Sequence, residues 1–255
     1  AKLTLVGDGD KIDPKELKES IQAEESRGVH GPQRGPVSIT QITEKGQVYT
    51  LNEINELTQI AKEFKLPVHM DGARFANALV SLGCTAAEMT WKAGVDVVSF
   101  GGTKNGLMGV EGVIFFDPQK AWEFELRRKR AAHLFSKHRY LSAQMLAYLE
   151  NDLWIELAGR ANKAASRLIA GLRKIKQVEF LVEPKANLIF VKMPAYMHRK
   201  AFAMGLEYYT WSEIDGVSDD TPVVARFVVD WSRSLGDIDK FLEIMRNAAQ
   251  KESYI

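Results

Sequence analysis

Hydrophobic and polar positions alternate in two ways along the first part of the chain. Short, β-branched apolar stretches predict strands, and apolar residues at helical spacing, together with helix-start residues, predict helices. The predicted strands are 37–43, 66–70, 95–100 and 110–116, and the predicted helices are 13–25, 51–64, 79–82 and 85–93. Strands that alternate with helices favour an α/β layer with a mainly parallel sheet. The apolar run 95–100 is typical of a strand that is buried on both faces of such a sheet, and the run Gly112–Phe116 is interpreted as a buried strand.

The second part of the chain has a different order of elements. Helical periodicity covers 118–130, 141–172 and 236–250, and the predicted strands are 178–182, 187–192, 206–211 and 222–229. This order is typical of a smaller α+β domain. We therefore expect a large domain over residues 1–149 and a small C-terminal domain over residues 150–255.

Composition narrows the function classes. The 255 residues are 45% hydrophobic, enough for a large core, and the net charge of +1 gives no global electrostatic case for nucleic acid or an anionic membrane. The single cysteine, Cys84, cannot form an internal disulfide, which favours a reducing compartment and a cytoplasmic location. No apolar run approaches the roughly 20 residues of a membrane span. The opening residues Ala1–Thr4 lack the apolar segment of a signal peptide.

Lys104 is the first candidate for chemistry. Gly101, Gly102 and Gly106 surround it, and glycines let the backbone approach a bulky planar ligand closely. The alternative is a glycine-rich turn with a lysine that faces solvent. The segment is not a Walker A loop, because no Gly-Lys-Ser/Thr follows a glycine at the required spacing.

Asp71 is the second candidate, in the segment His69–Arg74 after the preceding predicted strand. An aspartate beside a glycine also commonly begins a turn. Ligands bind at the carboxyl ends of the strands in such sheets, so Asp71 and Lys104 are expected on one edge. An acid and a lysine placed in this way are the pair that a pyridoxal 5'-phosphate (PLP) enzyme needs. The lysine forms a Schiff base with the cofactor aldehyde, and the acid keeps the pyridine nitrogen protonated.

Arg74 and Arg226 are candidates for anion binding. Arg226 lies in the apolar run Pro222–Val229, and an arginine in a buried strand needs a carboxylate partner. One interpretation is a bidentate clamp on an amino-acid carboxylate. The other is an edge strand with Arg226 facing water.

The histidines do not have the spacing of a metal site, so no metal is predicted. His30 lies among glycines and could line a loop, and His69 is either a core histidine or a neighbour of the cofactor. For each histidine, the sequence pattern alone favours a structural role over a catalytic one.

Four segments together resemble the low-specificity L-threonine aldolase family, in the bacterial-type branch that also contains phenylserine aldolases. The segments are His69-Met-Asp-Gly-Ala-Arg74, Ser99-Phe-Gly-Gly-Thr-Lys-Asn-Gly106, Arg130–Gln144 and Val224-Ala-Arg-Phe-Val228. The resemblance covers essentially all 255 residues. It implies the PLP-dependent transferase fold of fold type I, with a mainly parallel large domain, incomplete at its N-terminus, and a small α+β domain.

The resemblance also implies a reaction and roles for particular residues. Members split β-hydroxy-α-amino acids, such as threonine or phenylserine, into glycine and an aldehyde. Lys104 matches the Schiff-base lysine, Asp71 the acid at the pyridine nitrogen, and Arg74 an arginine beside the ring. Thr103 is assigned to cofactor binding, Arg226 to the substrate carboxylate and, with less support, His30 to the substrate. The expected assembly is a homodimer or homotetramer.

One departure from the family pattern concerns the start of the chain. In the family, roughly 90 residues precede the position of Ala1, and they carry a histidine that stacks on the cofactor and a loop that holds its phosphate. We expect this segment as another chain or as a further part of the same protein. The alternatives to the aldolase are another PLP lyase of this fold, such as a β-eliminating one, and a catalytically incomplete fragment.

Overall fold

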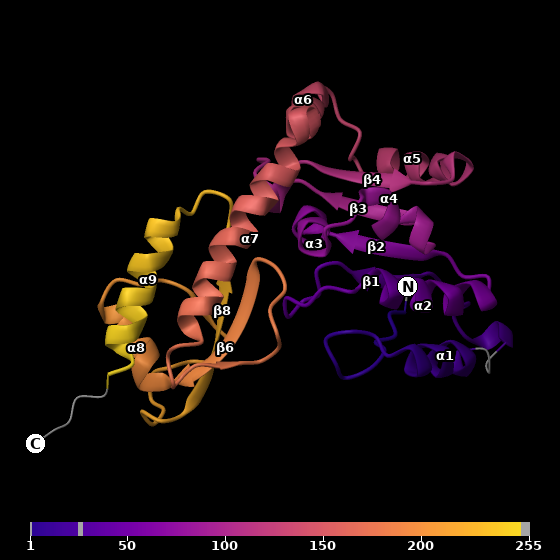
Figure 1. Cartoon of the computed structure of the whole chain (residues 1–255). Helices are drawn as coiled ribbons and strands as arrows, with labels where there is room; N and C mark the ends of the chain where they lie inside the picture. Colours follow the sequence, from indigo (N-terminus) through magenta and orange to yellow (C-terminus); the bar gives the residue numbers. More distant parts are fainter. Residues whose placement is uncertain (1, 25–27, 251–255) are drawn as a thin grey trace, which may run out of the picture. The chain divides into compact units, whose positions relative to one another are not determined.

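The structure, a computed structural model, describes residues 2–24 and 28–250 (Figure 1). It divides into two compact units. Unit 1 comprises Ala1–Glu44 and Val48–Glu156, and unit 2 comprises Lys45–Gln47 and Leu157–Ile255. The domain boundary expected from the sequence, between residues 149 and 150, stays a prediction.

Unit 1 is built on a four-stranded sheet in the order β1-β2-β3-β4. The strands are β1 (Val37–Thr40), β2 (Val68–Gly72), β3 (Val97–Gly101) and β4 (Glu111–Phe115). The first three are parallel, and β4 runs antiparallel to β3. The sheet is therefore mainly parallel, as the alternation of strands and helices predicted.

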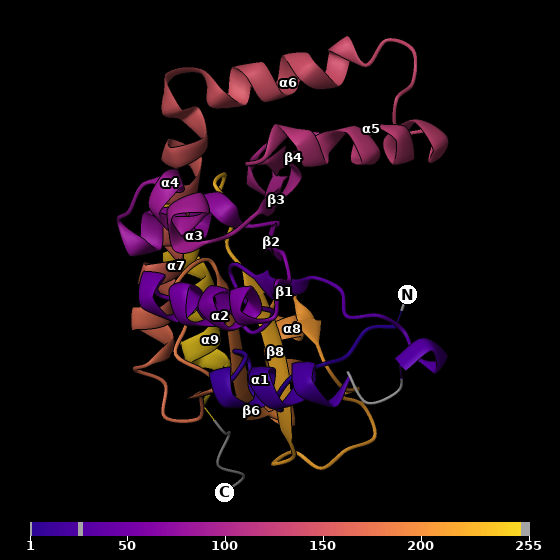
Figure 2. The same ribbon diagram turned by 90° about the vertical axis from the view of Figure 1, so that its right-hand side faces the viewer.

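The helices of unit 1 begin where the sequence provides caps. Asp13 accepts the N–H of Lys15 and of Glu16 at 2.9 and 3.0 Å, and Thr50 forms a reciprocal capping box with Glu53. The helices are α1 (Pro14–Ala23), α2 (Leu51–Glu63), α3 (Phe75–Leu82), α4 (Ala86–Met89), α5 (Ala121–Arg130) and α6 (Arg139–Leu149). Short 3-10 turns are η1 (Gly28–His30), η2 (Trp91–Ala93), η3 (Thr103–Asn105), η4 (Pro118–Lys120) and η5 (Glu150–Asp152). Both ribbon views show α5 and α6 on the β4 side of the sheet (Figures 1 and 2).

The two faces of this sheet differ in burial. One face carries apolar side chains that are almost completely buried: Val37, Ile39, Val68, Met70, Val98 and Phe100. The strand register places Ser38 beside His69, and Asp71 beside Ser99, on the other face. Among these four, Ser38 is exposed and the other three are half-buried. The candidate acid therefore lies on the polar face.

Two expectations about burial are wrong. Segment 95–100 was expected to be buried on both faces, but Val97 and Ser99 are only half-buried. The run Gly112–Phe116 was expected to be a buried strand, but Val113 and Ile114 in β4 are each 41% exposed. The reason for the second difference is that β4 is the last strand in the order of the sheet. Apolar composition alone does not distinguish an edge strand from a central one.

The long helical stretch predicted over 141–172 is interrupted. Helix α6 ends at Leu149, η5 follows, and α7 (Leu153–Leu172) begins after it. Asn151 has φ 52° inside the interruption, in the left-handed region that asparagine tolerates better than most residues. Helical periodicity continues across the break, so the pattern did not reveal it.

Unit 2 has a four-stranded antiparallel sheet in the order β5-β6-β8-β7. Its elements, besides the part of α7 after Glu156, are β5 (Glu179–Phe180), β6 (Leu188–Pro194), α8 (Ala195–Ala203), β7 (Tyr209–Thr210), β8 (Pro222–Val228) and α9 (Leu235–Ala248). Its core joins Leu168 and Leu172 of α7 with Leu242 and Met245 of α9 and with the inner side chains of β6 and β8. None of the helices within the described residues has the length and apolarity needed to cross a membrane.

Candidate active site

The carboxyl ends of β1, β2 and β3 meet at one edge of the unit 1 sheet, because these strands are parallel. Asp71 lies within β2 rather than after it, and Lys104 lies in the 3-10 turn that follows β3. Both belong to this edge. The sequence argument placed them there, and the described backbone agrees with that placement.

A close backbone approach joins the two segments. A Cβ atom on Gly101 would lie 2.5 Å from the carbonyl oxygen of Ala73 and 2.7 Å from its Cα, so only glycine fits at this position. Asp71 in turn accepts the N–H of Ala73 through Oδ1 at 3.0 Å. The turn after β2 and the start of the lysine loop are thereby held side by side.

The lysine loop is anchored by a buried amide. Asn105 is 3% exposed and donates through Nδ2 to the Tyr148 hydroxyl at 2.6 Å and to the Trp154 carbonyl at 2.8 Å. Burial raises the pKa of Tyr148 to about 12, so this hydroxyl stays protonated at neutral pH. The side chain of Lys104, next to this anchor, is exposed. The loop thus offers a solvent-accessible amine on a fixed backbone.

His69 bridges the three parallel strands on the polar face. Its Nδ1 lies 2.9 Å from Ser38 Oγ, and its Nε2 lies 2.8 Å from Ser99 Oγ. Burial lowers the pKa of His69, and the nearby carboxylate of Asp71 partly opposes that shift. A neutral imidazole can donate to one serine and accept from the other. His69 therefore connects the three strands beside Asp71 as a neutral imidazole rather than as a cation.

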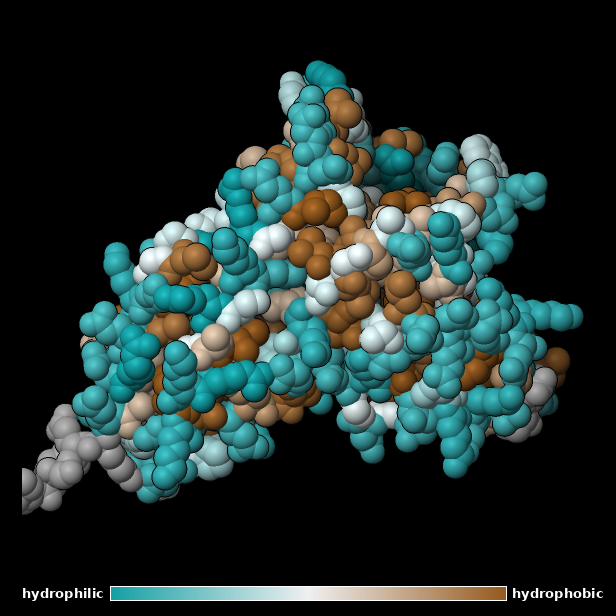
Figure 3. All heavy atoms as spheres, viewed as in Figure 1, coloured by the Kyte–Doolittle hydropathy of each residue, from teal (hydrophilic) through white to brown (hydrophobic). Residues whose placement is uncertain are grey.

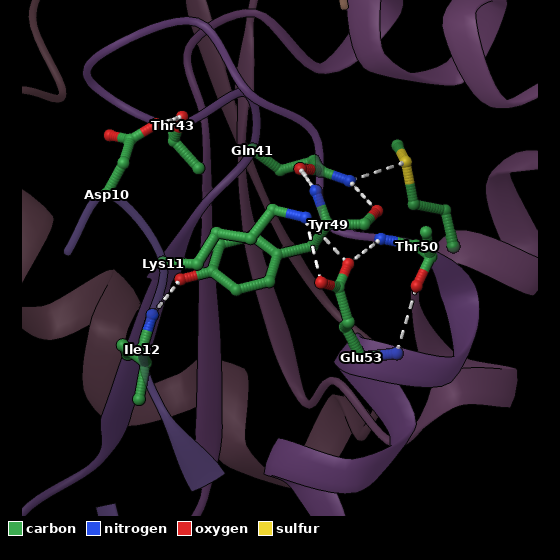
Figure 4. Close-up of polar contacts among 9 residues, drawn as sticks. Asp10, Lys11, Ile12, Gln41, Thr43, Tyr49, Thr50 and Glu53 are labelled. Atoms are coloured by element: carbon green, nitrogen blue, oxygen red, sulfur yellow. Dashed lines mark hydrogen bonds and ion pairs between the residues drawn. The ribbon is translucent and has the colours of Figure 1, made fainter. Parts of the chain in front are cut away.

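A polar network fixes the segment that follows β1 (Figure 4). Gln41 is fully buried and exchanges two hydrogen bonds with the backbone of Tyr49, at 2.9 and 3.0 Å. The Tyr49 hydroxyl accepts the N–H of Ile12 at 2.7 Å, and Thr43 donates to Asp10. The backbone N–H of Gln41 also donates to the carbonyl of Asp71 at 2.8 Å. The network supports the sheet edge from the β1 side.

The other candidates of unit 1 occupy separate places. Arg74 is half-buried at the N-terminal end of α3, three residues after Asp71. Thr103 is exposed, and its N–H donates to the carboxylate of Glu111 at 3.2 Å. His30 lies exposed in η1 and belongs to neither strand end that carries Asp71 and Lys104. Their assigned roles stay predictions.

Arg226 belongs to unit 2. It pairs with Phe190 on one side and Tyr209 on the other, so β8 is not an edge strand and the water-facing edge interpretation is wrong. The side chain is half-buried and lines a cavity of about 660 Å³. Charged residues Glu207, Arg233 and Asp237 also line that cavity. Its role as a clamp on a carboxylate stays a prediction.

Sequence reasoning missed three residues that shape the lysine loop: Asn105, Glu111 and Tyr148. Only Asn105 lies within the glycine-rich motif, and its neighbours gave no sign of a buried amide. Among the described residues, no group of three or more His, Cys, Asp or Glu side chains could hold a metal ion.

Comparison with solved structures shows the fold of the chain. A threonine aldolase from Leishmania major superposes with a TM-score of 0.82 at 23% identity, covering 94% of this chain and 68% of that chain. A protein from Exiguobacterium sp. 255-15 that is named "putative aromatic amino acid beta-eliminating lyase/threonine aldolase" gives a TM-score of 0.72 at 18% identity, covering 96% of this chain and 67% of that chain. The chain has the fold of the PLP-dependent transferases of fold type I, which confirms the predicted fold class.

Sequence comparison identifies the family. The model of the beta-eliminating lyase family matches residues 2–195, and the chain belongs to this family. Its relatives include low specificity L-threonine aldolases from Pseudomonas sp. (strain NCIMB 10558), 39% identical over 229 residues, and from Pseudomonas aeruginosa, 37% identical over 219 residues. These alignments cover 90% and 86% of this chain. They confirm the resemblance drawn from the sequence motifs. The chain spans 63% and 60% of the lengths of these two relatives.

Proposed function

We propose that this chain forms part of a PLP-dependent lyase that cleaves L-threonine or another β-hydroxy-α-amino acid, such as phenylserine, into glycine and an aldehyde. The observation that carries the proposal is the placement of Asp71 and Lys104 at adjacent strand ends on one sheet edge. The relatives at 39% and 37% identity, both named low specificity L-threonine aldolases, support the same reaction.

The residues at this edge fit the cofactor. Lys104 offers an exposed amine on an anchored loop, and Asp71 offers a half-buried carboxylate on the polar face of the sheet. Bound PLP supplies an electrophilic aldehyde and a ring that accepts electrons from the substrate. Lys104 would hold it covalently through Nζ, and Asp71 would keep the proton on the ring nitrogen. Arg74 and Thr103 would contact it beside these two.

The substrate would be oriented by Arg226. A guanidinium presents a planar pair of donors that matches a carboxylate, so Arg226 would hold the amino-acid carboxylate and fix the direction of the bond that breaks. His30 is the weaker candidate for substrate contact. With the cofactor bound, the amine of Lys104 and the amine of the substrate would be alternative partners for its aldehyde carbon.

The assay of products in the wild type and in Lys104→Ala tests this proposal. We expect the wild type with PLP and L-threonine or phenylserine to release aldehyde and glycine, and Lys104→Ala to release neither and to lose the visible absorbance of the lysine–cofactor link. Pyruvate and ammonia from hydroxy-amino acids would instead indicate β-elimination. No product from the wild type, with no visible absorbance, would indicate a catalytically incomplete fragment.

We further propose a homodimer or homotetramer. Hydrophobic side chains lie exposed on β4, α5 and α6. They include Val113 and Ile114 at 41%, Trp122 at 66% and Leu146 at 72%. On the face drawn in Figure 3, brown spheres lie scattered among teal ones around these elements. Exposed apolar surface of this kind commonly marks an interface. A cytoplasmic location is proposed from the single cysteine, Cys84, which favours a reducing compartment.

A further inference from the structure

Glu111, at the start of β4, contacts the backbone that leads into Lys104. Its Oε2 accepts the N–H of Gly102 at 3.1 Å, and its Oε1 accepts the N–H of Thr103 at 3.2 Å. The strand register pairs Glu111 with Gly101, which places the carboxylate beside the first turn of the loop. One carboxylate thus binds two consecutive backbone amides directly before the lysine.

These two contacts add hydrogen bonds from outside to the 3-10 turn η3, which also has hydrogen bonds within its own backbone. The carbonyl of Gly102 accepts the N–H of Asn105 at 3.0 Å and of Leu107 at 3.1 Å, which closes the turn from within. The first N–H groups of a helical turn have no partner inside it, so an acceptor from outside is needed. An ionised carboxylate is a stronger acceptor than a neutral group. Glu111 fills this place in η3, where no side chain of the turn itself acts as a cap.

We propose that Glu111 is a positioning residue for Lys104. It fixes the backbone at Gly102 and Thr103, and so limits the directions in which Lys104 Nζ meets the aldehyde of PLP. This inference rests on the proposed function. Since the long lysine side chain is exposed and free to change rotamer, the stiffness of its backbone governs how often the amine is correctly placed.

Hydrogen–deuterium exchange and cofactor recombination test this role together. The variants are Glu111→Ala, which removes both acceptors, and Glu111→Gln, which keeps one acceptor oxygen and the shape of the side chain. Glu56→Gln is the matched control, because Glu56 is exposed on α2, away from the proposed interface, and the change removes the same charge. Exchange is followed on a peptide that contains Gly102 and Thr103. Recombination is followed as the rate at which visible absorbance forms when PLP is returned to the dialysed protein.

We expect the two amides to exchange about tenfold faster in Glu111→Ala, an intermediate effect in Glu111→Gln, and no effect in the control. The rate of absorbance formation should fall in the same order, with little change in melting temperature. Unchanged exchange in both variants would overturn the contact. Faster exchange with an unchanged recombination rate would overturn the positioning role. A wild type that forms no absorbance with PLP would refute the proposed function itself, a result distinct from a defect confined to the variants.

Discussion

Replacing Gly101 by alanine tests whether the two halves of the candidate site depend on one backbone contact. The added Cβ would lie 2.5 Å from the Ala73 carbonyl oxygen and 2.7 Å from two further backbone atoms of Ala73. Because these atoms are backbone, no side-chain rotamer change can relieve the overlap. The ends of β2 and β3 must move apart, or the loop must shift.

The magnitude follows from two opposing effects. Overpacking of this kind costs about 1–3 kcal/mol, and the absence of a flexible neighbour favours the upper end. A glycine-to-alanine change also restricts the unfolded chain, which stabilises the fold by about 0.4–1 kcal/mol when the backbone conformation is compatible. The expected net loss for Gly101→Ala is therefore about 1–2.5 kcal/mol of unfolding free energy.

The same loop offers a matched control in Gly109→Ala. A Cβ on Gly109 would meet no atom within 4 Å, and its φ is not in the left-handed region, so only the unfolded-state effect remains. We expect this variant to be as stable as the wild type or more stable. The assay is urea unfolding followed by tryptophan fluorescence, with visible absorbance after PLP addition as the second readout. Equal stability of the two variants would refute the close approach of Gly101 to Ala73.

Three further changes test other parts of the account. Arg226→Ala should lower kcat/KM for amino acids about 100-fold through a raised KM, because a charge-assisted contact with the substrate carboxylate is lost. The visible absorbance of the bound cofactor should be kept. Lost absorbance with an unchanged KM would argue against Arg226 as the clamp on the carboxylate. Tyr148→Phe removes the acceptor 2.6 Å from Asn105 and should cost about 1–2 kcal/mol in urea unfolding, so an unchanged midpoint would contradict the anchor. Burial lowers the pKa of His198 in the folded protein, so this imidazole binds a proton more strongly in the unfolded chain. The free energy of unfolding should therefore be highest above about pH 6.5 and fall as the pH decreases. His198→Gln should reduce that fall in a pH series of unfolding free energies, and an identical slope would show that His198 does not contribute.

The sequence predicted the positions of Asp71 and Lys104 at the edge of the sheet, while their roles stay predictions. Asp71 precedes Gly72, Lys104 lies between Gly102 and Gly106, and strand ends can be inferred from the change of apolar to polar residues. The contacts that hold the lysine loop could not be predicted in this way. Asn105 meets Tyr148 across 43 positions of sequence, and no local pattern records such a pairing.

Two failures of the fold prediction have physical causes. Helix α8 was not predicted, because Ala195, Tyr196, Met197, His198 and Ala201 are all buried and leave no clear alternation of polar and apolar faces. The apolar strand β4 was interpreted as buried, because its composition resembles that of β3. Its position at the end of the sheet order is a property of topology, which single-strand composition does not determine.

The central claim is that Lys104 carries the cofactor. Borohydride reduction of the purified protein with PLP, followed by peptide mapping by mass spectrometry, tests it most directly. The account predicts one reduced phosphopyridoxyl group, on the peptide that contains Lys104. A reduced group on another lysine, or none on any peptide, would contradict it.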